Sequence, residues 1–182
     1  MNAFKPLLKL NNGKTFIQTI VEKLSSVCDE IIVVTGYKNN EIEQSLISTE
    51  QKEKIKFVFN EAYKSGMFTS LQAGLSGTNS KWFLYHFVDQ PSLPLSFYSD
   101  FANQIDDQFN WIQPTYQNRK GHPILFDSYV KEMILKESEY NTLRNISMVT
   151  SIKKKFWECN TELIFQDIDT QEDYRLTHSK KN

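Results

Sequence analysis

The stretch "DEIIVVTG" (residues 29–36) holds four consecutive β-branched apolar residues, closed by a threonine and a glycine. An unbroken apolar run of this length is typical of a strand that is buried on both faces, as strands of parallel sheets are. A second run, "KWFLYHFV" (residues 81–88), has the same character and is cut off by "DQPSLP". The two runs predict two strongly buried strands of a parallel sheet.

The segments around these runs alternate between helix and strand patterns. One-faced apolar spacing over residues 15–27 predicts a helix with Thr15 as its cap, and short helices are expected at 39–47, 69–77 and 128–135. Strands are expected at 55–59, 111–116 and 122–126, and the alternation continues through residues 162–170. Without repeats, low-complexity segments or a linker, residues 1–182 predict a single α/β domain with a mostly parallel sheet.

Composition excludes several classes of function. The chain has 182 residues and 40% apolar content, enough for one core. A net charge of −1 gives no field that would attract nucleic acid or an anionic membrane. No apolar stretch reaches the roughly 18 residues of a membrane span, and no signal-peptide pattern opens the chain. Two isolated cysteines, without zinc spacing, favour a reducing, cytoplasmic location.

Ligands of parallel α/β sheets bind at the carboxyl ends of the strands. Asp89 directly follows the run at 81–88, and Asp167 and Asp169 lie in "FQDIDTQEDY" near the end of the chain. Each site has a simpler interpretation: Asp89 starts a turn fixed by Pro91, and Asp169 or Thr170 caps a helix whose first turn carries acidic residues. Taken together, the two acidic sites indicate hard oxygen ligands for Mg²⁺.

Basic and nucleophilic residues give weaker signals. Lys14 is interpreted as an exposed solubility residue. His122 lies between Gly121 and Pro123, and a lone histidine in such a loop is more often a hydrogen-bonded packing residue than a catalyst. The sequence has no nucleophile elbow, no P-loop and no intact G-x-G-x-x-G.

Several stretches resemble one family, the nucleotidyltransferases that attach a nucleotide to molybdopterin, and most of all its molybdenum cofactor cytidylyltransferases. Residues 60–75, "NEAYKSGMFTSLQAGL", are similar to the family stretch N-x-x-[YW]-x-x-G-M-x-x-S-L-x-x-G-L. "FVDQP" resembles GDQP, "RKGHPILF" resembles the RGHP-[VI]-LF stretch of the cytidylyl branch, and "DIDTQEDY" resembles DIDTPEDL. The resemblance covers essentially the whole chain.

The resemblance implies a three-layer, Rossmann-like nucleotidyltransferase fold and the transfer of CMP from CTP to molybdopterin, with release of pyrophosphate. Asp89 and Asp169 would hold Mg²⁺, and Lys5 would contact the triphosphate. Gly66, Met67 and Ser70 would lie near the base and ribose. A further set would line the pterin side, namely Gly121, His122 and Pro123. The implied partners are CTP or another nucleoside triphosphate, a molybdopterin-type acceptor and a molybdenum hydroxylase.

The family's opening motif, LAAGxSxRMGxxKxLLxL, is matched here only from its methionine. Met1 and Lys5 align with the motif, Asn2 stands where the family has glycine, and Phe87 stands where it usually has glycine. The first strand and the glycine-rich loop are therefore expected to be missing, through a late-assigned start or a real truncation. The chain as given is then expected to be a weak enzyme, and the strands at 31–34 and 82–88 must either pair directly or leave backbone groups without partners.

Two other functions remain open on the sequence. The chain could be a non-catalytic accessory protein that binds the molybdenum cofactor and delivers it to a hydroxylase. It could also be a nucleotidyltransferase that acts on another phosphorylated acceptor. The retained carboxylates, Asp89 and Asp169, favour an enzyme over the accessory protein.

Overall fold

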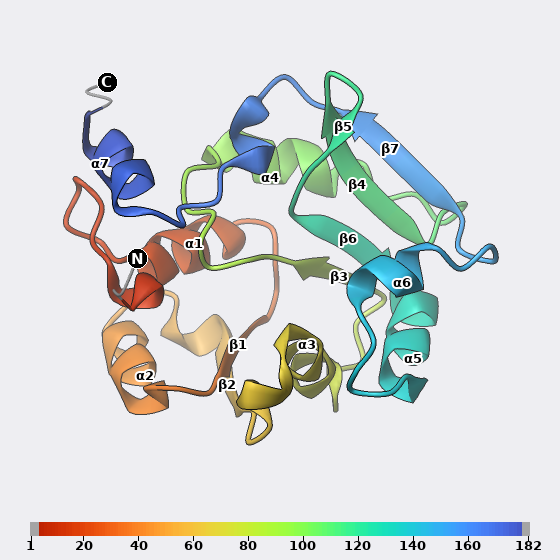
Figure 1. Ribbon diagram of the computed structural model, residues 1–182, viewed down its shortest axis with the longest axis horizontal. Coiled ribbons are helices and arrows are strands. Elements are labelled where there is room, and N and C mark those ends of the chain that lie inside the picture. The colour runs from red at the N-terminus through yellow and green to blue at the C-terminus, as the bar shows by residue number, and fades with distance from the viewer. Residues whose placement is uncertain (1–3, 180–182) are drawn as a thin grey trace.

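The computed structural model describes residues 4–179 as helices, strands and connecting loops (Figure 1). The helices are α1 (Phe16–Leu24), α2 (Asn39–Ile47), α3 (Met67–Leu75), α4 (Leu95–Ala102), α5 (Ser128–Lys136), α6 (Leu143–Ser147) and α7 (Gln171–Ser179). The strands are β1 (Ile31–Thr35), β2 (Ile55–Phe59), β3 (Trp82–Tyr85), β4 (Trp111–Tyr116), β5 (Arg119–Lys120), β6 (Ile124–Asp127) and β7 (Lys154–Glu158). Short 3-10 turns occupy Lys5–Leu7, Lys52–Lys54, Tyr63–Ser65 and Glu162–Phe165.

The first sheet pairs β1 with β2 in parallel, with Ile31 opposite Ile55 and Thr35 opposite Phe59. Helix α1 begins where the sequence predicts, because Thr15 and Gln18 form a reciprocal capping box at its start. Helix α3 packs closely on β1: a Cβ on Gly74 would lie 2.7 Å from a methyl group of Val34. Only a glycine allows this approach, so it fixes the loops that precede α3 against the end of β1.

The second sheet has the order β3-β6-β4-β5, with β7 also paired to β4. Strand β7 runs parallel to β4, whereas β6 runs antiparallel to both of its neighbours. The α/β class predicted from the sequence is confirmed, with parallel pairing in β1–β2 and β4–β7 and antiparallel pairing around β6. The reversal follows from the short β5 hairpin, which turns the chain back between β4 and β6.

One local expectation was wrong. Residues 162–170 were expected to continue the alternation of strand and helix, but Glu162–Phe165 form a 3-10 turn whose Ile164 is fully buried. The segment is short and mixes charged with apolar residues, so tertiary contacts rather than local pattern decide its conformation.

β1 and β3 belong to different sheets, and among residues 4–179 no backbone hydrogen bond joins them. Two apolar clusters correspond to this division: one gathers around α1, α2, β1 and α4, and the other around α3, α5 and β6. In the described part of the chain no helix is long and apolar enough to cross a membrane. The architecture therefore places two partial sheets side by side, with the ends of β1 and β3 near the amino-terminal segment.

Candidate active site

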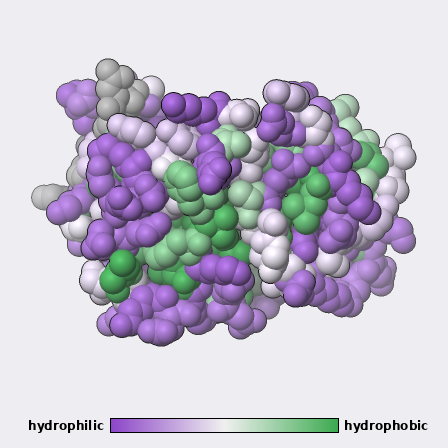
Figure 2. All heavy atoms as spheres, turned by 90° about the horizontal axis from the view of Figure 1, so that it is seen from below, coloured by the Kyte–Doolittle hydropathy of each residue, from purple (hydrophilic) through white to green (hydrophobic). Residues whose placement is uncertain are grey.

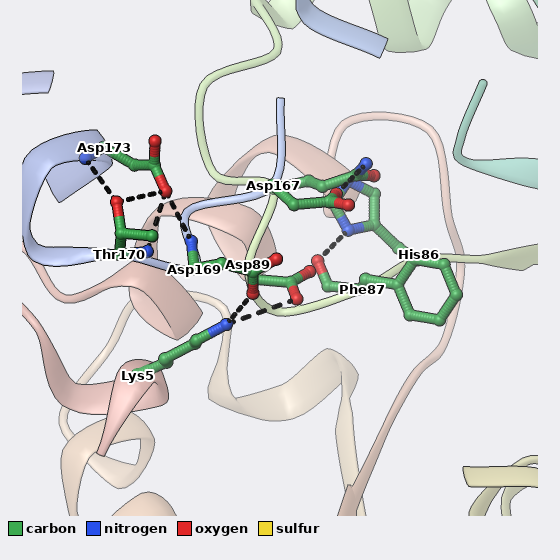
Figure 3. A network of polar contacts seen from close by, with 9 residues as sticks. Lys5, His86, Phe87, Asp89, Asp167, Asp169, Thr170 and Asp173 are labelled. Atoms are coloured by element: carbon green, nitrogen blue, oxygen red, sulfur yellow. Dashed lines mark hydrogen bonds and ion pairs between the residues drawn. The ribbon is translucent and has the colours of Figure 1, made fainter. Parts of the chain in front are cut away.

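Lys5, Asp89 and Asp169 come together from three distant segments of the chain (Figure 3). Lys5 opens the first 3-10 turn, Asp89 follows β3, and Asp169 precedes α7. The Lys5 ammonium lies 3.7 Å from Asp89 Oδ2 and forms a hydrogen bond with Asp169 Oδ1. The backbone amide of Ile168 donates to the carbonyl of Asp89 at 2.9 Å, which ties the two acidic segments together. Three predicted site residues thus share one location.

The charges of this cluster are strongly coupled. The side chain of Asp89 is 28% exposed, and its Oδ1 is buried without a hydrogen-bond partner within the described residues. Burial and then the neighbouring Asp167 carboxylate raise the pKa of Asp89, and Lys5 opposes them. Burial lowers the pKa of Lys5, but the surrounding carboxylates outweigh it, so the net pKa is raised. The surrounding carboxylates therefore stabilise the charged form of Lys5.

Asp167 and Gln90 also belong to this cluster. The sequence placed Asp167 beside Asp169 in the second acidic site, but it gave Gln90 no role. Gln90 is 2% exposed, and its Nε2 donates to Asp167 Oδ1 at 2.7 Å. The amide therefore holds the Asp167 carboxylate beside Asp89, where it raises the pKa of Asp89. The only sequence signal for Gln90 was its position directly after Asp89. Its partner, Asp167, lies 77 residues away and could not be inferred from the sequence.

Helix α7 reconciles the two interpretations of the "DIDT" stretch. The hydroxyl of Thr170 accepts from the amide of Asp173 at 3.1 Å, and Asp173 Oδ2 accepts from the amide of Thr170 at 2.7 Å. Thr170 and Asp173 therefore cap the helix, as the simpler interpretation expected. The side chain of Asp169 instead bonds to Lys5, so capping and site formation use different residues.

A buried asparagine, Asn60, forms hydrogen bonds with the segment that was predicted to bind the nucleotide. Asn60 Nδ2 donates to the hydroxyls of Thr69 at 2.9 Å and Ser70 at 3.0 Å. Gly66 has a φ of +125°, a conformation that residues with side chains rarely adopt, and Met67 is 62% exposed. Met67 and Ser70 line the same cavity as residues 87 and 88, which lead into Asp89. Binding of a base there stays a prediction.

The predicted acceptor segment adjoins the chain before Asp89. The ring of His122 packs edge-on against Phe87 with centroids 4.6 Å apart, and its backbone amide donates to the Ile164 carbonyl at 3.1 Å. A Cβ on Gly121 would lie 2.6 Å from the side chain of Ile164, so only glycine fits there. His122 Nδ1 is buried with no partner in the described chain, and burial lowers the pKa of this histidine. Pro123, the third residue of the segment, is buried.

A second histidine supports the loop before Asp89. His86 Nδ1 lies 2.7 Å from the Phe87 carbonyl, so this nitrogen carries the proton, and Nε2 accepts from the hydroxyl of Tyr98 at 2.8 Å. Burial lowers the pKa of His86 to about 4. His86 is therefore a neutral structural residue at physiological pH. Met1 and Asn2, which carry part of the opening motif, lie outside the described residues.

Binding of a divalent cation by the acidic cluster stays a prediction. Within residues 4–179 no group of three or more histidine, cysteine or acidic side chains forms a complete metal cage. Mg²⁺ commonly takes only one or two carboxylates and completes its shell with substrate phosphates and water. Asp89 and Asp169 supply two carboxylates, and the unpaired, buried Oδ1 of Asp89 is an acceptor that such an ion would satisfy.

The chain has an open α/β fold in which Lys5, Asp89 and Asp169 gather between the loop after β3 and the start of α7. The structure of a nucleotidyl transferase from Methanothermobacter superposes with a TM-score of 0.79 at 22% identity, over 96% of this chain and 83% of that one. At this identity the likeness concerns the fold.

Family and sequence comparisons show which family the chain belongs to. Residues 1–150 match the model of the MobA-like NTP transferase domain, and the chain belongs to that family. It is 25% identical over 174 residues to the molybdenum cofactor cytidylyltransferase of Escherichia coli, covering 96% of this chain and 86% of the relative. It is also 28% identical over 177 residues to a probable molybdenum cofactor guanylyltransferase of Bacillus cytotoxicus, covering 93% and 86%.

Proposed function

We propose that this chain transfers CMP from CTP to the terminal phosphate of molybdopterin. The observation that carries the proposal is the meeting of Lys5, Asp89 and Asp169 between the loop after β3 and the start of α7. Membership of the MobA-like family supports nucleotidyl transfer, and the relatives named above support a molybdopterin-type acceptor. The cytidylyl assignment rests on the resemblance of the "GHP" and "GM-x-x-SL" stretches to that branch.

The proposed reaction needs no nucleophilic side chain. An oxygen of the acceptor phosphate attacks the α-phosphorus of CTP, the bond from that phosphorus to the bridging oxygen of the β-phosphate breaks, and pyrophosphate leaves with the electron pair. A phosphate monoester is largely a dianion at pH 7, because its second pKa is about 6, so no general base has to remove a proton. Catalysis then depends on positioning and charge neutralisation.

The residues of the cluster would divide these tasks. The ammonium of Lys5 would weaken its ion pairs with Asp89 and Asp169 and contact the triphosphate instead. The two carboxylates would hold a bound Mg²⁺, which would supply charge neutralisation to the phosphates. Gln90 would hold the Asp167 carboxylate in place beside Asp89. Residues 66–70 would lie against the base and ribose, and residues 121–123 against the pterin.

Purified protein incubated with molybdopterin, Mg²⁺ and an equimolar mixture of CTP and GTP tests the proposal. We expect pyrophosphate release and formation of the cytosine dinucleotide in clear excess over the guanine one, because a pocket that hydrogen-bonds one base leaves polar groups unpaired with the other. Excess guanine product would reassign the nucleotide, and tight cofactor binding without pyrophosphate release would favour an accessory protein instead.

A matched pair of variants connects the turnover to the cluster. Asp89→Asn keeps the shape of the side chain and removes its charge, and Asp100→Asn makes the same change at an exposed position of α4. Turnover that is lost in the first and kept in the second ties the reaction to Asp89. Equal activity in both variants would remove the acidic cluster from the mechanism.

A further inference from the structure

The segment that carries Asp89 is irregular and has few ways to hold its own shape. Residues 86–93 follow β3 and form turns that belong to no strand or helix. Pro91, within the segment, has no amide hydrogen to donate. A side chain that acts in a site has to stay within roughly 0.5 Å of its productive position. The groups that hold this segment therefore decide where the Asp89 carboxylate lies.

Apolar packing supports the segment on only part of its surface. Residues 86–88 line a groove of about 730 Å³ between β1 and β3, whose other walls are residues 31–34, residues 82–85 and apolar side chains of α1 and α3. Figure 2, which views the molecule from the side where β1, β2 and α3 lie, shows hydrophobic atoms gathered at the centre of this face between hydrophilic margins. Atoms that line such a space lack packing partners on that side. Hydrogen bonds therefore contribute much of what fixes the segment.

These hydrogen bonds go to alternating carbonyl groups, those of residues 87, 89, 91 and 93. The first two accept from His86 Nδ1 and from the backbone amide of Ile168. The last two, the carbonyls of Pro91 and Leu93, both accept from the ammonium of Lys23, each at 2.7 Å. Lys23 lies in the last turn of α1. One lysine thus supplies two of the four contacts that hold these carbonyls.

The ammonium of Lys23 has no acidic partner in the described part of the chain. No carboxylate among residues 4–179 forms an ion pair with it, and the neighbouring Glu22 pairs with Lys14 at 2.5 Å. Burial lowers the pKa of Lys23, because a charge away from water is unfavourable. The two carbonyls are therefore the groups that compensate this buried charge.

We propose that Lys23 is a positioning residue for Asp89: it fixes the chain directly after the aspartate and so sets the place of the carboxylate. The proposal rests on the proposed function, which gives Asp89 its role as a ligand of Mg²⁺. The two contacts of Lys23 restrain the chain at Pro91 and Leu93, beyond Asp89, while Ile168 restrains the Asp89 carbonyl itself. Misplacement of a reacting group by about 1 Å can cost roughly 100-fold in rate.

Two buried lysines provide a matched pair of variants. Lys23→Met keeps a long apolar stem and removes both donors to the segment. Lys131→Met makes the same change on α5, where the buried Lys131 ammonium donates to the carbonyl of Thr78, beyond the end of α3. Each variant leaves backbone carbonyls without their donor, so both should melt below the parent. Their comparison separates an effect on the site from a general loss of stability.

Mn²⁺ binding without nucleotide is the first measurement, because it needs no turnover. We expect Lys23→Met to bind Mn²⁺ about tenfold more weakly, the scale on which residues that orient metal ligands act, and Lys131→Met to bind it as the parent does. Amide exchange at Gln90 and Leu93 should become about tenfold faster in Lys23→Met only.

Turnover adds a second readout that a purely structural role would not give. In Lys23→Met, kcat should fall by about tenfold or more. The KM for CTP should stay constant, because no hydrogen bond joins Lys23 to residues 66–70 in the described chain. Lys23→Arg should recover most of the Mn²⁺ affinity and of kcat, since a guanidinium also donates to two carbonyls.

The outcomes separate this proposal from the proposed function. Equal Mn²⁺ affinity in Lys23→Met and the parent, or equal losses in the two methionine variants, would overturn the positioning role. If Lys23→Met fails to fold, Lys23→Gln, which keeps an amide donor, takes the same test with the same criteria. A parent protein that binds Mn²⁺ but releases no pyrophosphate would overturn the proposed function alone, and a parent that binds no Mn²⁺ would overturn both.

Discussion

Strands β1 and β4 are of similar length and apolar character, yet they end in opposite surroundings. β4 lies between β6 and β7, and its Trp111 and Ile112 are almost completely buried. β1 has β2 on one side and the groove on the other. No backbone hydrogen bond among the described residues joins β1 to β3, whereas Lys5, Asp89 and Asp169 meet beyond the end of β3. The acidic cluster therefore links the amino-terminal segment to the loop after β3 and to the start of α7.

The largest expected effect tests whether that link serves function or stability. Asp89→Asn should lower kcat/KM by at least about 100-fold, the scale of losing one group that stabilises developing charge. Its melting temperature at pH 7 should not fall, because the aspartate carries an unpaired buried oxygen. Parallel measurement of turnover and thermal unfolding, with Asp100→Asn as control, checks both. A variant that unfolds would make Asp89 a structural residue of the turn instead.

A smaller effect contrasts the two strands directly through matched isoleucines. Ile112→Ala should cost about 2–5 kcal/mol, since it opens a cavity in a packed interior. Ile32→Ala, on the half-buried wall of the groove, should cost only about 1 kcal/mol, because it widens a space that already exists. Urea unfolding of both variants measures the difference. Equal losses would show that the groove walls are packed as tightly as the second sheet.

The smallest effect is a pH dependence at Asp89. Burial, followed by the Asp167 carboxylate, raises the pKa of Asp89 in the folded protein above the ordinary 3.8. The native state therefore binds this proton more tightly than the unfolded state, and its contribution to stability is present below pH 3.8 and lost as pH rises through the folded pKa. Asp89→Asn should accordingly be more stable than the parent at pH 7.

The measurement is a pair of unfolding curves at neutral and acidic pH. The stability advantage of the variant should shrink as the pH falls through the folded pKa of Asp89 and disappear below pH 3.8, where the parent carboxyl is protonated in both states. An advantage that persists at low pH would assign the effect to packing rather than to charge.

Much of the fold followed from local pattern. The apolar runs placed β1, β2 and β3, and the capping residue Thr15 placed α1. Strand-end reasoning selected Asp89 and Asp169, which the structure brings to one lysine. Strand β7 was not predicted because its charged residues obscure the apolar alternation. The contact between Gln90 and Asp167 was not predicted because it joins segments far apart in the chain.

The sequence by itself predicted the strands β1, β2, β3, β4 and β6, the helices α1, α2, α3 and α5, and the acidic positions Asp89 and Asp169. Apolar periodicity and caps could show them because they are local properties of a few adjacent residues. Only the tertiary structure decided how β1 and β3 relate. Their apolar runs are those of interior strands, but pairing depends on which edge another segment occupies, and that is a property of the whole packed chain. The groove between them, and the unpaired Oδ1 of Asp89, could be seen only once the two sheets were in place.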